Sequence, residues 1–426
     1  MNSKWAWWIS QVARRIWFRA TLFSVLAIAT ALLAIVVSPY IPADLPAKIG
    51  ADAVDKILGI IASSMLTVTT FSLSTMVSAY AAATSSVTPR ATRLVMEDST
   101  TQNVLATFVG SFLFSLVGII ALTTGAYGDQ GRLVLFLVTL AVIAVIVVAL
   151  LRWIDHLSRL GRVTETTDRV EEATESAMRI WKRNPHLGGH PLRDLQKQIW
   201  KTRVPVFATT IGYVQHVDAS ALSDIAGEME AQIAVMAIPG KLVTPADPVA
   251  FVTKAADEET MAGIADCFTI DDIRSFDQDP RFGACVLTEI ASRALSPALN
   301  DPGTAIDVIT RATRLLAMWA APTEGEAPEI AYPRLYVLPI DPSDLFDDFF
   351  RPIARDGAGL VEVGLRLQKA LDALSRLQDG IYREHALRHS REALARAEVA
   401  LHIDADKERL RNTSIAKSVA KRSHSS

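Results

Sequence analysis

Four long stretches without a charged side chain occupy most of the first 152 residues and restrict the fold more than any other feature. A helix needs about 20 apolar residues to cross the roughly 30 Å hydrocarbon core of a bilayer. The charge-free stretches contain 24, 33, 30 and 19 residues, so each is long enough or nearly so. They predict a transmembrane domain over 1–156, with helices at about 17–38, 57–83, 103–125 and 133–153.

The basic residues are distributed unevenly over the loops, and this predicts the orientation of the chain. Nine Lys and Arg residues flank the first helix on its N-terminal side, the second and third helices where they join, and the end of the fourth; the opposite side has three. Loops rich in Lys and Arg stay in the cytoplasm. We therefore expect a multi-pass protein with its N- and C-termini in the cytoplasm. Tryptophans near helix ends are expected at the membrane interface; they are Trp5, Trp7, Trp8, Trp17 and Trp153.

The second predicted helix is unusually rich in hydroxyl groups. Between residues 63 and 86 it carries 13 Ser, Thr and Tyr side chains and no charge. Five of them recur every three or four residues and share one helix face; they are Ser63, Thr67, Thr70, Ser74 and Ser78. Such a stripe can line a water-filled path and replace part of an ion's hydration shell. It can equally pack against another helix, because small hydroxylated side chains allow close approach.

The rest of the chain is dense in charge, and its apolar residues come in short periodic groups, as in a cytoplasmic α+β domain. Its expected parts are a helical connector at 157–201, a small β module at 202–256, a helical region at 257–322, a C-terminal α/β region at 323–402 and a flexible tail at 403–426. The β module looks like the barrel-sandwich fold of lipoyl and membrane-adaptor proteins. In the connector, Val163, Val170 and Ala177 keep a seven-residue spacing, which predicts self-association and a homo-oligomer.

Four passages resemble a known family. They read "FSLSTMVSAYAAATSSVTPRATRLV", "TQNVLATFVGSFLFSLV", "GYVQHVD" and "FDQDPRFGACVLTEIASRALSPALNDPGTA". On these residues the chain resembles the predicted bacterial membrane proteins grouped as domain of unknown function 2254. The family usually has Ser-Pro-Arg where this chain has Thr88-Pro89-Arg90. The resemblance implies a bacterial inner (plasma) membrane protein with this topology and carries no established activity.

The last of these passages is dense in charged residues and prolines. Ser296-Pro297 and Asn300-Asp301-Pro302 predict the end of one helix and the N-cap and first residue of the next. The polar residues that we single out are Asp277, Asp279, Arg281, Arg293, Asn300 and Asp301. They can cap helices and fix a corner by salt bridges. They can also form a polar site for an ion or small ligand, or a joint that couples the cytoplasmic domain to the membrane.

No motif of a known enzyme class is present. The chain has no P-loop, no GxGxxG after a strand, no GxSxG and no HExxH. His385 and His389 lie four residues apart among Arg and Glu, which predicts a solvated helix face, and Cys267 and Cys285 fit no metal motif. A net charge of −3 argues against nucleic acid as a partner. We therefore predict no catalytic residues, no metal site and no cofactor.

Two functions remain open. The hydroxyl stripe and the heptad spacing favour an oligomeric channel or passive transporter with a cytoplasmic regulatory domain. No predicted span contains an ionisable residue, which argues against a proton-coupled or voltage-driven machine. The alternative is a membrane-anchored sensor or scaffold whose soluble domain binds a ligand or protein partner.

Overall fold

The fold is taken from a computed structural model, which describes Trp7 and residues 12–13, 15–37, 51–96, 98–125, 129–159, 161–194, 203–322, 329–377 and 380–415. The chain divides into two compact units. We call Ile9–Thr166 the membrane unit, and Met1–Trp8 together with Thr167–Ser426 the globular unit.

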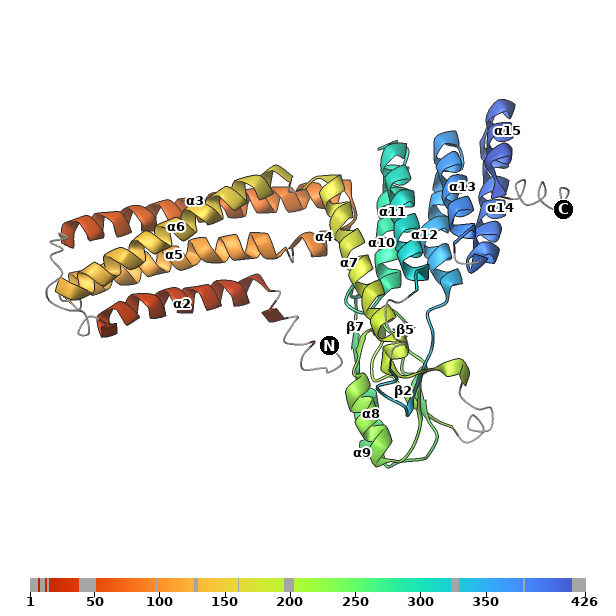
Figure 1. The fold of residues 1–426 in the computed structure, drawn as a ribbon, viewed down its shortest axis with the longest axis horizontal. Coiled ribbons are helices and arrows are strands. Elements are labelled where there is room, and N and C mark those ends of the chain that lie inside the picture. Colours follow the sequence, from red (N-terminus) through yellow and green to blue (C-terminus); the bar gives the residue numbers. More distant parts are fainter. Residues whose placement is uncertain are drawn as a thin grey trace. The chain divides into compact units, whose positions relative to one another are not determined.

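Long helices form the membrane unit, and one of them is central. Helix α5 packs against α2, α3 and α6, and Figure 1 shows these four helices running alongside one another. Small residues permit this close approach, since Gly110 of α5 lies against the backbone of Phe23 and Gly118 lies against Leu58. The helices of this unit are α2 (Ile16–Val37), α3 (Ala51–Ser86), α4 (Pro89–Met96), α5 (Ser99–Thr123) and α6 (Asp129–Arg159).

Three of these helices are long and apolar enough to cross a membrane. The qualifying segments are Ala53–Ala82 of α3, Ser99–Thr123 of α5 and Gly131–Arg159 of α6. The described apolar part of α2, Trp17–Leu33, is shorter, so its crossing stays a prediction. The predicted fourth helix ends at residue 153, whereas α6 continues to Arg159.

Turn and cap residues define where several of these helices begin. Helix α3 ends at Ser86, and Pro89 begins α4, at the position where proline is best tolerated because its missing N–H would have no helical partner. Helix α5 is capped by Asp98, whose carboxylate accepts the backbone N–H of Thr101 at 2.8 Å.

The globular unit contains two sheets that share one hydrophobic core. The larger sheet has the order β1-β8-β4-β6-β2 and is parallel on its β1-β8-β4 side; the smaller sheet is antiparallel, in the order β5-β3-β7. The strands are β1 (His190–Pro191), β2 (Val204–Phe207), β3 (Gly212–Val217), β4 (Ile233–Val235), β5 (Leu242–Val243), β6 (Pro248–Val252), β7 (Phe268–Asp271) and β8 (Leu335–Val337).

The barrel-sandwich expectation for 202–256 is not confirmed. Strands β2 to β6 do form within this range, and Asp218 caps the helix after β3 by accepting the N–H of Ala221 at 3.0 Å. However, β1, β7 and β8 come from outside this range and complete the two sheets. The segment is therefore part of a larger mixed β layer rather than a closed module.

Helices make up the rest of the globular unit. Figure 1 shows α10 to α14 lying side by side, and α10 contacts both α11 and α12. The helices are α7 (Val163–Arg183), α8 (Ala219–Glu228), α9 (Glu258–Asp266), α10 (Pro280–Ala294), α11 (Pro302–Ala320), α12 (Pro342–Asp356), α13 (Val361–Ser375), α14 (Arg383–Ala400) and α15 (Asp404–Thr413), with short 3-10 turns η2 (Pro185–Gly188) and η3 (Leu192–Asp194).

The heptad spacing of α7 reflects packing inside the chain, which removes this support for self-association. Val170 and Ala177 are buried, as are the interleaved Thr174 and Trp181. A Cβ at Gly283 of α10 would collide with Thr174, so the two helices approach closely there. The seven-residue spacing therefore marks a buried face of α7 that packs against α10 of the same chain.

The expectation of a flexible tail from residue 403 is wrong for residues 404–413. These residues form α15, and its Leu410 is buried against Leu401 and Ala397. Burial of Leu410 and the ion pair between Arg411 and Glu398 of α14 hold a helix that has no apolar stripe of its own. Residues 416–426 lie outside the described part of the chain.

Candidate functional site

The five predicted stripe residues of α3 are all exposed in the single chain. The opposite side of α3, with Ile61, Met65 and Ser72, is buried, and α5 is the helix that α3 contacts most. Because residues 3.6 apart complete one helical turn, the hydroxyl stripe faces away from this packed side. The structure thus brings Ser63, Thr67, Thr70, Ser74 and Ser78 onto one outward line. Large apolar side chains such as Leu66, Phe71 and Leu73 flank that line.

Each stripe hydroxyl donates its proton to the backbone of its own helix. Thr67 donates to Ser63 O at 3.0 Å, Thr70 to Leu66 O at 2.9 Å and Ser78 to Ser74 O at 3.0 Å. Ser63 and Ser74 donate in the same way, to Ile60 O and Thr70 O. With the proton turned inward, the outward side of the stripe presents oxygen lone pairs. Lone pairs are the groups that coordinate a cation.

The polar residues singled out in the 271–307 motif do not form a single site. Asp277, Asp279 and Arg281 lie at the start of α10, whereas Asn300 and Asp301 lie beyond its other end. A helix of 15 residues is about 22 Å long, so the two groups are well separated. Arg293 lies in the last turn of α10, where a cation interacts favourably with the helix dipole.

The predicted helix start at Asp301-Pro302 is confirmed, and Asp279-Pro280 begins α10 in the same way. Asp279 caps α10 by accepting the N–H of Phe282 at 3.0 Å, and Asp301 caps α11 by accepting that of Thr304 at 3.1 Å. Asn300 adopts the left-handed conformation (φ 47°) that turns the chain between the helices. Pro280 and Pro302 occupy the first turn of each helix.

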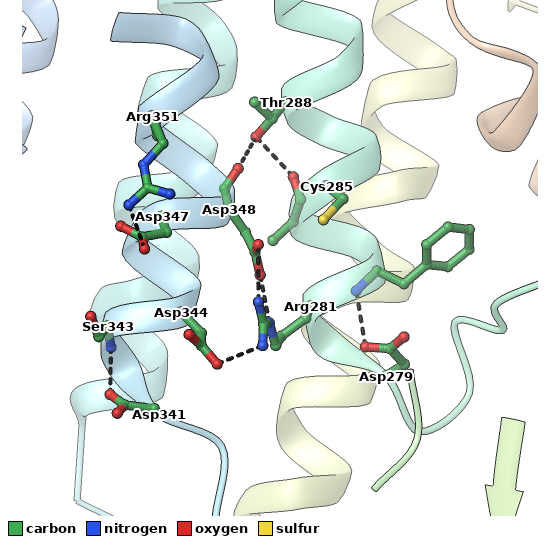
Figure 2. Close-up of polar contacts among 12 residues, drawn as sticks. Asp279, Arg281, Cys285, Thr288, Asp341, Ser343, Asp344, Asp347, Asp348 and Arg351 are labelled. Carbon is green, nitrogen blue, oxygen red and sulfur yellow. Dashed lines mark hydrogen bonds and ion pairs between the residues drawn. The ribbon is translucent and has the colours of Figure 1, made fainter. Parts of the chain in front are cut away.

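The start of α10 carries a dense ionic network. Arg274 binds Asp279 through two contacts, at 2.7 and 2.9 Å, and the Asp279 side chain is 3% exposed. Burial raises the pKa of the Asp279 carboxyl, and the hydrogen bonds from Arg274 oppose that shift. Figure 2 shows Arg281 reaching α12, where it binds Asp348 at 2.7 Å and Asp344 at 2.5 Å.

Arginines surround the acidic residues of α12. Asp347 pairs with Arg351 and with Arg388 of α14, each at 2.7 Å. It also contacts Nε2 of His389 at 3.0 Å. The prediction of a solvated face for His385 and His389 is therefore wrong for His389, which is 2% exposed and packed near Phe346 and Phe350. The side chains of α12 and α14 that look hydrophilic in sequence satisfy one another.

The cysteine in this network is poorly suited to nucleophilic chemistry. Burial, reinforced by nearby Asp348, raises the pKa of the Cys285 thiol to about 11. The thiol is therefore protonated at neutral pH. Over the described residues, no group of three or more His, Cys, Asp and Glu side chains is arranged to hold a metal ion.

A buried polar cluster that was not predicted from the sequence lies at one end of α5 and α6. Nε2 of His156 lies 2.9 Å from Oδ2 of Asp98, and Thr101 donates to the same oxygen at 2.6 Å. The ring of His156 stacks on Trp153, which is 2% exposed. The signal was available, since Asp98 precedes an apolar run as an N-cap. Because the predicted fourth helix ended at residue 153, His156 was not recognised as a helical residue that could face Asp98.

One cavity of the globular unit has a carboxylate on its wall. It has a volume of about 270 Å³ and is lined mainly by apolar groups of Trp181, Leu187, Val217 and Ala219, together with Asp277. Sequence analysis placed Asp277 in a candidate polar site, and this cavity is the space that it borders.

The comparisons with known proteins identify a family without a described activity. The family described as "Predicted membrane protein (DUF2254)" matches residues 13–373. Uncharacterized proteins of Mycobacterium bovis and Mycobacterium tuberculosis are each 33% identical over 112 residues, which is 25% of this chain. The chain spans only 22% of the length of these curated relatives. No solved structure matches it.

The three apolar helices agree with the family's description, and the family match covers most of the chain. The protein therefore belongs to the family of predicted membrane proteins known as domain of unknown function 2254.

Proposed function

We propose that the protein is a passive, cation-selective permeation pathway formed by several copies of the chain, with α3 lining the path and the globular unit regulating it. The outward hydroxyl stripe of α3 is the observation that carries this proposal. Ser63 and Ser78 are 15 residues apart, so the stripe covers about 22 Å of the roughly 30 Å hydrocarbon core. Within the described part of the chain no other helix covers the five stripe residues, which are exposed.

The flanking residues support an arrangement of several α3 helices around one axis. In a ring of helices, each helix presents a narrow face to the lumen and packs on its neighbours at both sides of that face. The stripe of α3 is narrow and is bordered by Leu66 and Leu73 on one side and by Phe71 on the other. These apolar side chains would contact adjacent copies, and the oxygens would face water.

The oxygen lone pairs favour cations. A hydroxyl that has used its proton inside the helix offers only an acceptor, and an array of acceptors stabilises a cation rather than an anion. The described spans of α3 and α5 contain no charged residue between 57 and 89 or between 99 and 123 that would hold a permeating ion tightly. Weak, repeated coordination suits conduction.

Ion flux through purified protein in liposomes tests the proposal. Thr70→Val keeps the side-chain shape and removes the oxygen, so we expect lower K⁺ or Na⁺ flux, and Thr70→Trp should block it. Thr75→Val is the matched control, because Thr75 also donates to its own helix, to Phe71 O at 3.0 Å, but lies off the stripe. Flux no greater than in protein-free liposomes, or equal flux in the two valine variants, contradicts the proposal.

Back-bonded hydroxyls also tolerate lipid, so the assembly needs a separate test. Leu73→Cys should form disulfide-linked dimers in membranes, because Leu73 is exposed beside the stripe, where a neighbouring copy would pack. Ser72→Cys should not, because Ser72 is fully buried within its own chain. Equal cross-linking of both variants, or none, contradicts assembly through α3.

A ligand sensor is the second candidate, and the 270 Å³ cavity beside Asp277 favours it. In that case the membrane helices serve as an anchor. A globular fragment that retained a specific ligand, together with a full chain that passed no ions, would favour the sensor over the permeation pathway.

A further inference from the structure

A tryptophan from the far N-terminus is buried in the globular unit. Trp7 is 6% exposed. Its ring stacks on that of His216, with centroids 5.4 Å apart and planes inclined by 26°. Its indole N–H donates to Oδ2 of Asp277 at 3.2 Å. The three residues are far apart in sequence, and Trp7 precedes the first residue of α2 by only nine positions.

The groups that receive Trp7 are fixed in place. His216 is fully buried on β3, next to an irregularity in its pairing with β7 between Val214 and His216. Such a bulge re-aims the side chains beside it. Asp277 is held by Ser275, whose hydroxyl donates to Oδ2 of Asp277 at 2.9 Å and accepts the N–H of Asp277 at 3.2 Å.

Gln278, the residue after Asp277, anchors the loop at 275–278 from two sides. The carbonyl of Gln278 accepts the indole N–H of Trp181 in α7 at 2.6 Å. Its side-chain oxygen accepts the N–H of Val217 in β3 at 3.4 Å. The stacking surface and the carboxylate are therefore also held by contacts within the globular unit other than those with Trp7.

We propose that His216, Ser275 and Asp277 form an indole slot, an interaction surface whose partner is Trp7 of the same chain. The slot combines a flat ring for stacking with one acceptor for an indole N–H. A phenylalanine side chain could stack on the ring of His216, but it has no N–H to donate to Asp277. Occupation of the slot fastens the segment before α2 to the globular unit. The inference concerns the globular unit and does not rest on the permeation pathway.

Hydrogen exchange of the full chain in lipid nanodiscs, followed by mass spectrometry, tests the slot. Trp7→Ala should speed exchange in peptides covering β3 and residues 275–278 on the order of fivefold to thirtyfold, the effect of losing one or two modest contacts. Trp7→Phe should fall between the wild type and Trp7→Ala, because it keeps the stack and loses the N–H donor. Trp17→Ala is the control, because Trp17 is 57% exposed in α2.

Three outcomes overturn the proposal. Unchanged exchange around β3 in Trp7→Ala shows that the slot is not occupied. Exchange in Trp7→Phe equal to that of the wild type removes the requirement for an indole. A uniform rise that extends to α13 makes Trp7 a general core residue rather than the occupant of a slot. Flux measurements are independent of all three, so this test and that of the permeation pathway can fail separately.

Discussion

At the scale of single residues, two aspartates share a sequence pattern and differ in their surroundings. Asp279 and Asp301 each precede a proline and cap a helix. Asp279 also binds the largely buried Arg274, whereas the exposed side chain of Asp301 accepts the backbone N–H and the hydroxyl of Thr304. The same substitution at the two positions separates the effect of a cap from that of an ion pair.

We expect Asp301→Ala to cost about 1 kcal/mol of stability, the usual effect of losing an N-cap. Asp279→Ala should cost about 3–5 kcal/mol, because it also leaves the Arg274 guanidinium without its partner at a site that is only 20% exposed. Asp279→Asn keeps a capping oxygen and should fall between them. Urea unfolding of the full chain in detergent, followed by circular dichroism, measures the differences. Equal costs at the two positions would contradict this account.

His389 makes the globular unit sensitive to acid. Burial, with Arg388 adding to it, lowers the pKa of His389 to about 4, and Asp347 opposes the shift. The unfolded chain has a histidine pKa of about 6.5 and binds the proton first, so stability falls as pH drops from about 6.5 to about 4. The loss can reach about 3 kcal/mol. Thermal unfolding of His389→Gln between pH 7 and 4 should show a smaller loss than the wild type, and exposed His402→Gln should behave as the wild type. If the stability of all three proteins fell equally between pH 7 and 4, His389 would not be the group responsible.

The helix caps were predictable from the sequence, and the buried partners were not. Asp279 and Asp301 act on the N–H three residues later, so the local pattern contains the whole interaction. His389 meets Asp347 across two helices, and Trp7 meets Asp277 across 270 positions. The hydrophilic neighbours of His389 in the sequence therefore predicted a solvent-exposed side chain. The position of Trp7 near a helix end predicted a side chain at the membrane interface.

At the scale of elements, periodicity identified the helices and strands, and it did not identify their partners. The heptad spacing in α7 marks a buried face, but the same spacing fits contact with another copy and contact with α10 of the same chain. The strand pattern at 202–256 is present, yet β8 enters the same sheet from residues 335–337. Long-range pairing of this kind leaves no signal in a single sequence.

The turn after β4 gives a test at this scale. Gly240 has φ +93°, and a Cβ there would overlap the carboxylate of Asp279. Gly240→Ala should therefore destabilise the globular unit by about 2–5 kcal/mol, from backbone strain and from displacement of the α10 cap.

The control for this substitution is Gly227→Ala. Gly227 lies within α8, and nothing is within 4 Å of the position of an added Cβ. The change should stabilise the protein by about 0.5–1 kcal/mol, because alanine loses less backbone freedom than glycine in a helix. Thermal unfolding of both variants measures these changes in stability. If Gly240→Ala left the stability unchanged, the turn would not be held against Asp279.

At the scale of the whole molecule, the burial of Trp7 constrains how often the chain crosses the membrane. Trp7 belongs to the globular unit, as do its partners His216 and Asp277. Side chains in contact lie on the same side of a bilayer whose core is about 30 Å thick. The chain between Trp7 and the globular unit must then cross an even number of times. Three helices qualify by length and composition, so a fourth crossing is required if all three cross.

We expect helix α2 to supply this crossing. It has 22 residues, which at 1.5 Å each extend about 33 Å. We expect the segments at 38–50 and 126–128 to lie outside the cell, and both Trp7 and α15 to lie in the cytoplasm, where loops rich in Lys and Arg remain. A single cysteine introduced at Pro42 or Tyr127 should react with a membrane-impermeant maleimide in intact cells. Cysteines at Ser3 and at Glu408 should react only after permeabilisation. Labelling at both Ser3 and Pro42 in intact cells, with Glu408 protected, would mean that α2 does not cross, and the Trp7 contact could not then form within one chain.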